Sequence, residues 1–356
     1  ATELSFAGSL QLDYKTLPAR KSPQDALLNN FTAEAGFKVS ATVSEHLQVS
    51  AKMCFGCHQF EAAYAQVDFN ITDEANIRAG RIQVPFGDFY QRHDPANHKT
   101  SSKPIIYDMG HMVRPDAYNF GVFPIPLPDN GLEFFGTHFF GESVYTSYSL
   151  FAVNGLKGNA RTGEFNWKEA RQPQLVDTDR LPTLGVRWSG GVSDLSSTLL
   201  DVTLGASAMA GTYDKTSSAR YALVGGHLSM RFAHRVVLRG EYAMRMTEFS
   251  QEALADPLAF QQTPVSSHYL KHGGYVELEV PLTGDFEAIV RGDAMWRQGV
   301  VPLSVPLGPE ARVYRGTAGV LWITKRFLRW KLNYEYWWFS DFAPEHLAHL
   351  SAVTFF

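Results

Sequence analysis

The only two cysteines of the chain, Cys54 and Cys57, stand three positions apart, and His58 follows the second directly. In a C-x-x-C-H motif, the two thiols can attach covalently to a c-type haem, and the adjacent histidine can ligate its iron. The spacing therefore predicts haem c bound through Cys54 and Cys57, with His58 as an axial ligand of the haem iron. An oxidised Cys54–Cys57 loop that stiffens a tight hairpin, with His58 incidental, is the alternative.

A sixth iron ligand is expected in the long, proline-rich segment 85–130, which contains the run YDMGHM. The candidates are Met109, His111 and Met112, with His93 and His98 as alternatives. A zinc site is not expected here, because no fourth ligand follows Cys54, Cys57 and His58 at a spacing typical of zinc sites. Because no nucleophile–base pair or acid pair stands out among the charged residues, we expect that the chain is not an enzyme.

The elements that position these residues are predicted from a period-two alternation of side chains. In FLRWKLNYEYWWF, residues 327–339, leucines and aromatic residues alternate with arginine, lysine, asparagine and glutamate. The same alternation recurs in 236–245, 275–280 and 286–297. A soluble sandwich would not carry arginine and glutamate on the polar side of strand after strand. A membrane β-barrel does, because its outer face contacts lipid and its inner face contacts water.

Composition agrees with an all-β membrane protein. Aromatic residues make up 13% of the 356 residues, yet no apolar run approaches the ~20 residues that a membrane helix needs. The net charge of −4 argues against a nucleic-acid-binding surface.

The alternation divides the chain into sixteen expected strands of one transmembrane antiparallel barrel that spans residues 1–356. Their spans are 3–14, 31–43, 46–54, 59–71, 76–84, 131–140, 143–154, 182–191, 197–212, 218–232, 235–248, 268–281, 285–297, 311–325, 327–339 and 345–356. Short turns alternate with longer connections, which is typical of barrels with short periplasmic turns and long extracellular loops. Counting from a periplasmic N-terminus places the hairpin at 54–59 on the extracellular side, with Cys54 on the inner face. The alternative is that the first strand is miscounted and the motif is periplasmic, nearer to soluble electron carriers.

Several segments resemble the phosphate-selective (O/P-type) porins of bacterial outer membranes. They are IRAGRIQVPFG (77–87) and DNGLEFFGTHFFGESVYTSYSLFAVNG (129–155), and the terminal AVTFF resembles an outer-membrane assembly signal. The resemblance implies a 16-stranded barrel, commonly trimeric, whose third loop folds inward to narrow the pore. The cysteine–histidine motif is not part of that family's usual pattern.

If the apolar parity contacts lipid, the opposite parity lines a pore, and segment 85–130 forms a constriction in it. The alternative is that this segment covers the mouth as a lid or contacts a neighbouring subunit. The basic residues expected to line the pore are Arg92, Lys99, Lys103, Arg114, Arg239, Arg245, Arg291, Arg297, Arg315, Arg329 and Lys331. Their clustering predicts a basic wall and a mild preference for anions.

The sequence therefore predicts an outer-membrane channel for small polar or anionic solutes, a homotrimer, with a haem c near one mouth. A passive channel with a structural Cys54–Cys57 disulfide is one alternative. A redox barrel is another, and it would need partner c-type cytochromes, because one haem cannot cross the ~25 Å apolar band alone.

Overall fold

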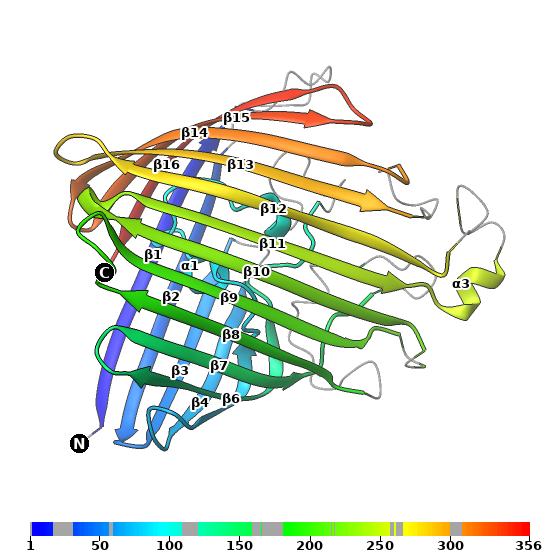
Figure 1. Ribbon diagram of the computed structural model, residues 1–356, viewed down its shortest axis with the longest axis horizontal. Coiled ribbons are helices and arrows are strands. Elements are labelled where there is room, and N and C mark those ends of the chain that lie inside the picture. The colour runs from blue at the N-terminus through cyan, green and yellow to red at the C-terminus, as the bar shows by residue number, and fades with distance from the viewer. Residues whose placement is uncertain are drawn as a thin grey trace.

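The structure is a computed structural model that describes residues 2–16, 31–56, 60–108, 120–158, 165, 181–214, 216, 218–256, 260, 266–299 and 308–356. Within these residues, sixteen antiparallel strands form one closed barrel, in which each strand pairs with its sequence neighbours and β1 pairs with β16 (Figure 1). This confirms the predicted fold class and strand number. No helix in the described ranges is long and apolar enough to cross a membrane.

The first eight strands are β1 Glu3–Lys15, β2 Phe31–Ser44, β3 Leu47–Phe55, β4 Glu61–Asn70, β5 Asn76–Gln83, β6 Pro128–Phe140, β7 Val144–Val153 and β8 Thr183–Ser193. The last eight are β9 Leu199–Thr212, β10 Arg220–Phe232, β11 Val237–Glu248, β12 His268–Pro281, β13 Phe286–Gln298, β14 Arg312–Lys325, β15 Leu328–Phe339 and β16 Glu345–Phe355. Short helical turns lie in the connections: α1 Phe89–Arg92, η2 Ile105–Tyr107, η3 Ala233–Arg235 and α3 Gln251–Ala255. Every predicted span overlaps its strand, and the largest difference is the start of β6, where Pro128 already pairs with Gln83.

Exposure alternates along the strands as the sequence predicts. In β15, Leu332, Tyr334 and Tyr336 are exposed, whereas Lys331 and Glu335 are buried. Leucine, valine, phenylalanine and tyrosine side chains are likewise exposed on the other strands, so the outer wall of the barrel is apolar. In hydrocarbon, a closed barrel pairs every backbone donor and acceptor of its strands, and such a wall is soluble only in lipid. The chain is therefore a transmembrane β-barrel.

Both chain termini lie at the same end of the barrel, together with the short turns (Figure 1). These turns are 45–46, 71–75, 141–143, 194–198, 233–236, 282–285 and 326–327. Outer-membrane barrels carry short turns on the periplasmic side, so this end is the periplasmic end and the opposite end is extracellular.

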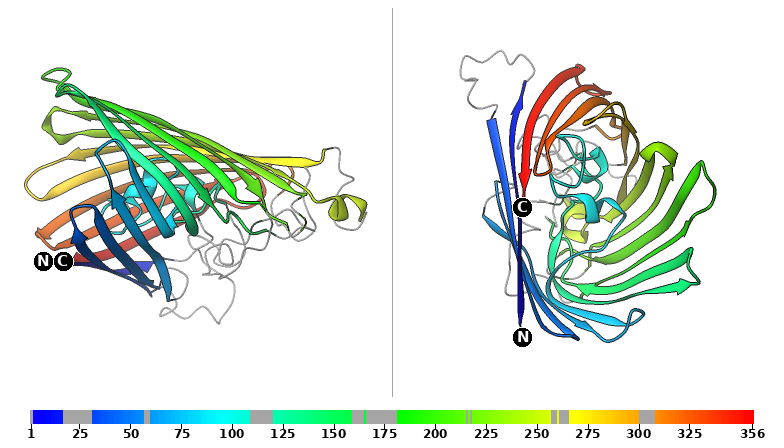
Figure 2. Two further views of the ribbon diagram at one scale, coloured as in Figure 1. Left: turned by 90° about the horizontal axis from the view of Figure 1, so that it is seen from below. Right: turned by 90° about the vertical axis from the view of Figure 1, so that its left-hand side faces the viewer.

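The connection between β5 and β6 lies against the inner side of the wall. We call its described residues, 84–108 and 120–127, the inner segment, and Figure 2 shows it within the ring of strands. One apolar cluster packs Phe86 and Phe123 of this segment against Leu223 of β10. A second packs Ile105 and Phe120 against Met295 of β13, Trp337 and Phe339 of β15. The hydrophobic core therefore sits inside the barrel, between the inner segment and the wall.

Candidate pore lining

Polar side chains of the late strands anchor the inner segment. Arg291 of β13 donates to the hydroxyls of Thr100 and Ser102, at 2.8 Å each. Arg315 of β14 donates to the carbonyl oxygen of Lys103 at 2.6 Å. The Asp293 carboxylate lies between the two guanidinium groups, within 3.1 Å of each, and accepts from the Ile105 backbone N–H at 2.9 Å. Because this pair of strands satisfies both side-chain and backbone groups of the segment, it fixes the segment to the wall.

A buried carboxylate on β11 makes a second anchor. Glu241 accepts from the Asp88 backbone N–H at 2.8 Å and from the Tyr107 hydroxyl at 2.7 Å, and Tyr275 donates to its other oxygen. Burial, and secondarily the Glu241 carboxylate, raise the pKa of Tyr107 well above its ordinary value. Tyr107 is therefore a neutral phenol that donates to the carboxylate.

Further anchors come from β15. Lys331 donates to the carbonyl oxygens of Pro95 and Thr100, at 2.7 and 3.2 Å, and Asn333 accepts from the backbone N–H of Ser101 at 2.7 Å. Ser102 donates to Glu335 of the same strand. The wall from β11 to β15 is therefore occupied by the inner segment.

The basic residues predicted on the late strands face inward, but most do not face water. The buried ones are Arg245, Arg291, Arg297, Arg315 and Lys331, and each is 2% exposed or less. Arg329 donates to the Ala96 carbonyl oxygen at 2.6 Å. Except for Arg297, which donates to the Gly299 carbonyl oxygen, these cations hold the inner segment, because its carbonyl oxygens are among their acceptors. Arg114 lies outside the described residues.

Several of the ion pairs that reach the lumen share one orientation. The Arg78 side chain is 25% exposed, whereas its partners Asp68 and Glu133 are 10% and 4% exposed. The Arg239 side chain is 19% exposed over Glu279, which is 3% exposed and also pairs with Lys99.

Arg92, with a 15% exposed side chain, lies 3.7 Å from a Glu277 that is 3% exposed and 3.2 Å from an Asp88 that is 22% exposed. In the pairs of Arg78 and Arg239, the cation is therefore more exposed than its carboxylate partners, whereas Arg92 has one deeper and one more exposed partner.

The pair of Lys52 with Asp94 has the opposite orientation, as has the pair of Arg92 with Asp88. Lys52 of β3 pairs with Asp94 of the inner segment, and here the carboxylate is the more exposed partner. His93 adjoins this pair, with Nε2 3.2 Å from Asp94 and Nδ1 2.6 Å from the Tyr90 carbonyl oxygen, to which it donates. Burial lowers the pKa of His93 to about 4, so its ring is neutral at pH 7.

Two lumen residues, Arg78 and Arg187, were not predicted. Arg187 of β8 donates to the Gly87 carbonyl oxygen at 2.8 Å, and its guanidinium lies 5.2 Å from the centre of the Tyr90 ring. Both arginines follow the period-two pattern of their strands, in IRAGRIQ and GVRWSG, and this parity could have identified them.

The described half of the cysteine motif lies where parity predicts, near the extracellular end of β3. Cys54 is 7% exposed and pairs in register with Gly36 and Glu61. It is disulfide-bonded, and the only other cysteine of the chain is Cys57. Gly56 has φ of +89°, and a Cβ there would lie 1.8 Å from the Ala33 carbonyl oxygen, so this tight turn requires glycine.

Of the residues predicted to hold a haem, the described ranges contain Cys54, His93 and His98, and Cys54 is in its disulfide-bonded state. His93 is engaged by Tyr90 and Asp94, and the buried ring of His98 packs on Phe89. The described ranges contain no cluster of three or more histidine, cysteine or acidic residues that could hold a metal ion. The residues Cys57, His58, Met109, His111 and Met112 lie outside the described residues.

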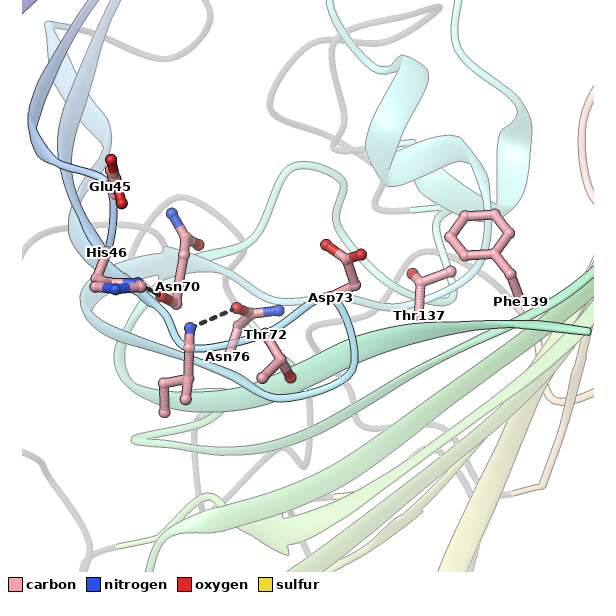
Figure 3. A pocket seen from close by; sticks show the side chains of 9 residues that line it. Glu45, His46, Asn70, Thr72, Asp73, Asn76, Thr137 and Phe139 are labelled. Atoms are coloured by element: carbon pink, nitrogen blue, oxygen red, sulfur yellow. Dashed lines mark hydrogen bonds between the residues drawn. The ribbon is translucent and has the colours of Figure 1, made fainter.

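The periplasmic mouth holds two pockets. The first, of about 500 Å³, is drawn in Figure 3 and is lined by Glu45, His46, Asn70, Ile71, Thr72, Asp73, Asn76, Thr137 and Phe139. The second, of about 380 Å³, is lined by Tyr145, Val192, Ser193, Asp201, Thr203, Ser229, Arg231, Val237 and Arg239. Phe139 of the first pocket lies opposite Tyr145 of the second, with ring centres 6.4 Å apart, so the two pockets are neighbours. Polar and apolar side chains together line them.

Solved structures of outer-membrane channels share this architecture. The outer membrane channel DcaP of Acinetobacter baumannii is 10% identical, with a TM-score of 0.59 over 100% of this chain and 97% of that chain. The anion-selective porin from Comamonas acidovorans is 9% identical, with a TM-score of 0.58 over 100% of both chains. OmpT of Vibrio cholerae, in a trimer form, is 10% identical, with a TM-score of 0.57 over 100% of both chains. No family model matches the chain, and no curated protein matches its sequence.

The chain therefore has the porin fold, a closed 16-stranded barrel with an apolar outer wall. An even-stranded antiparallel barrel of this kind is the architecture of the bacterial outer membrane, and we place the chain in that membrane.

Proposed function

We propose that the protein is a passive outer-membrane channel for small polar solutes, with a mild preference for anions. The exposed cations of the lumen ion pairs carry this proposal. Arg78, Lys99 and Arg239 each present a cation to the water, while their partner carboxylates are more deeply buried. A passing anion lies closer to these cations than to the carboxylates. The attraction therefore exceeds the repulsion, because Coulomb energy falls with distance.

The inner segment supplies the constriction. Its contacts with β9, β11, β13, β14 and β15 place it across the inner side of the wall. Arg78, with a 25% exposed side chain, is one of the charged groups that a solute in the lumen would meet.

Selectivity is tested in planar bilayers by the reversal potential under a potassium chloride gradient. We expect Arg239→Gln to lower the chloride-to-potassium permeability ratio. A unit charge ~6 Å from a passing ion in water contributes ~0.7 kcal/mol, or about threefold. Glu279 keeps Lys99 as a partner in this variant, so the local structure is retained.

Arg326→Gln is the matched control, because it removes the same charge at an exposed periplasmic turn. A wild-type channel that prefers potassium would contradict the proposal. So would an Arg239→Gln channel with an unchanged permeability ratio.

Two comparisons support further details. The name of the Comamonas acidovorans porin states anion selectivity, and the Vibrio cholerae structure is a trimer form. With the sequence resemblance to phosphate-selective porins, they support a homotrimer of anion-preferring channels. Mass photometry of the protein in detergent tests the trimer, and competition of phosphate with chloride current tests the phosphate preference.

Two competing proposals concern the sulfur atoms of Cys54 and Cys57. The bonded state of Cys54 supports a structural disulfide in a passive channel. The C-x-x-C-H spacing supports a covalent haem c, held by Cys54 and Cys57 with His58 on the iron, in a barrel that exchanges electrons with c-type cytochromes. Intact mass and a pyridine haemochrome spectrum on one sample separate them. A mass two protons below the reduced chain supports the disulfide, and the added mass of one haem supports the redox barrel.

A further inference from the structure

Aromatic and histidine side chains form a continuous belt on the outer wall from β11 to β15. Tyr242 hydrogen-bonds His272 at 2.8 Å, and the His272 ring stacks on Trp296 at 5.3 Å between centroids. Trp296 donates to the Tyr314 hydroxyl at 3.1 Å, and the Tyr314 ring lies 5.4 Å from Trp338. Belts of this composition lie at the level of the lipid headgroups. The wall from β11 to β15 therefore faces lipid.

A groove of about 720 Å³ lies in the same wall, next to this belt on the side of the membrane centre. Glycines of four adjacent strands form its floor: Gly226, Gly240, Gly274 and Gly292. Leu228, Tyr242, Val276, Ala294 and Trp296 form its sides. In register, Gly274 lies opposite Ala294, whereas Val276 stands between Gly240 and Gly292 and Tyr242 stands between Gly226 and Gly274. The small residues therefore form gaps between these protruding side chains.

We propose that this groove binds one acyl chain of a membrane lipid whose headgroup lies at the belt. The occupant follows from the position of the groove. It is apolar, it opens onto hydrocarbon, and Tyr242 and Trp296 belong both to its sides and to the headgroup belt. A subunit interface over the same strands would bury a belt whose polar groups suit contact with headgroups and water.

Shape rather than hydrophobicity stabilises such a contact. Lipid tails are as apolar as the wall, so no hydrophobic gain distinguishes one site on the wall from another. Residues without side-chain bulk let a hydrocarbon chain approach the backbone closely, and many dispersion contacts then add up. The rest of the apolar wall carries protruding leucine, valine and phenylalanine side chains and offers fewer such contacts.

Filling the groove tests the proposal, and the chain offers a matched pair of variants. Gly292 lines the groove and Gly316 lies opposite it on β14, outside the lining. Both are exposed, and a Cβ at either position would meet no heavy atom within 4 Å. Gly292→Leu and Gly316→Leu therefore add the same side chain to the same wall without a clash, and only the first occupies the groove.

The measurement is native mass spectrometry of the full chain in detergent, titrated with dipalmitoyl phosphatidylethanolamine. We expect one retained lipid per chain in the wild type and in Gly316→Leu. We expect about tenfold lower occupancy in Gly292→Leu, which corresponds to ~1.4 kcal/mol of lost packing. Ala294→Leu, from the side of the groove, should lower occupancy in the same way, and retarded migration on an unheated gel confirms that each barrel is folded.

Three results would overturn the proposal. The first is equal lipid retention by Gly292→Leu and Gly316→Leu. The second is the same lipid loss in both variants, which would indicate general disturbance of the wall. The third is dissociation of an oligomer by Gly292→Leu alone, which would identify the groove as a contact with a second copy of the chain.

Discussion

Asp293 joins the inner segment to the wall, and we expect Asp293→Asn to release that segment. The wild-type carboxylate accepts from the Ile105 backbone N–H, from Arg291 and from Arg315, and its side chain is fully buried. Asparagine is isosteric and keeps one oxygen for Ile105. Its amide group would place N–H donors against two buried guanidinium groups, which are themselves donors and cannot accept a hydrogen bond.

The magnitude follows from these contacts. Removing one partner of a buried charge pair costs ~3–5 kcal/mol. Arg291 keeps Glu277 at 3.2 Å and Arg315 keeps Glu335 at 3.7 Å, so the expected loss is at the lower end, ~3 kcal/mol. This loss falls on the anchoring of the segment, because the strand ladders of β12, β13 and β14 do not depend on the Asp293 side chain.

Single-channel conductance and limited proteolysis report the release. We expect larger or noisier unitary currents and faster cleavage within 84–127, while the barrel itself stays folded. Asp201→Asn is the control, since Asp201 pairs with an Arg231 side chain that is 59% exposed, and exposed pairs contribute ~1 kcal/mol or less. Wild-type current and wild-type cleavage in Asp293→Asn would refute the idea that this carboxylate holds the segment.

Three further predictions concern the same interior. Burial lowers the pKa of His93 to about 4, below its ordinary 6.5. The stability that the neutral His93 ring contributes to the inner segment is therefore complete above about pH 6.5, and up to ~3 kcal/mol of it is lost as the pH falls toward 4. The rate of proteolytic cleavage in this segment should rise over the same pH range, and His93→Gln should make that rate less dependent on pH. Gly56→Ala should destabilise the barrel by ~3 kcal/mol or more in urea unfolding, because φ is +89° and the added Cβ meets the Ala33 carbonyl oxygen. Gly141→Ala, with φ of +71° and no atom nearby, should cost only ~1 kcal/mol, and equal costs at the two glycines would contradict this account. Phe120→Ala removes a buried ring that packs on Trp337, and we expect it to lower the free energy of unfolding by ~3 kcal/mol or more in the same assay. A decrease below ~1 kcal/mol would show that this packing contributes little.

The barrel could be predicted from the sequence because its outer wall obeys a single local rule. Each strand alternates lipid-facing and inward residues, so the pattern, the strand spans and the short turns were all readable from neighbouring residues. Leu332 and Tyr334 against Lys331 and Glu335 show this in β15. Trp337 follows the same parity but is an aromatic residue on the inner side, where the inner segment brings Phe120 into contact with it.

The pore lining could be predicted only in part, because parity gives a direction and not a neighbour. The sequence places Arg291 and Arg239 on the same inner face. Only the path of the inner segment separates them, covering the first and leaving the second beside water. Which partner of an ion pair is the more exposed one likewise depends on the tertiary contacts around the pair and not on the parity of its strand.

The anchoring of the inner segment also has a consequence for the order of folding. Asp88 and Glu241 are 153 positions apart, and Ser102 and Arg291 are 189 positions apart. Neighbouring strands pair over short loops, whereas these anchors require that β11 to β15 are already in place. The segment therefore becomes fixed only after these strands have paired, in a long-range step like the closure of β1 on β16. We expect a folding barrel to have a wider interior until this step is complete.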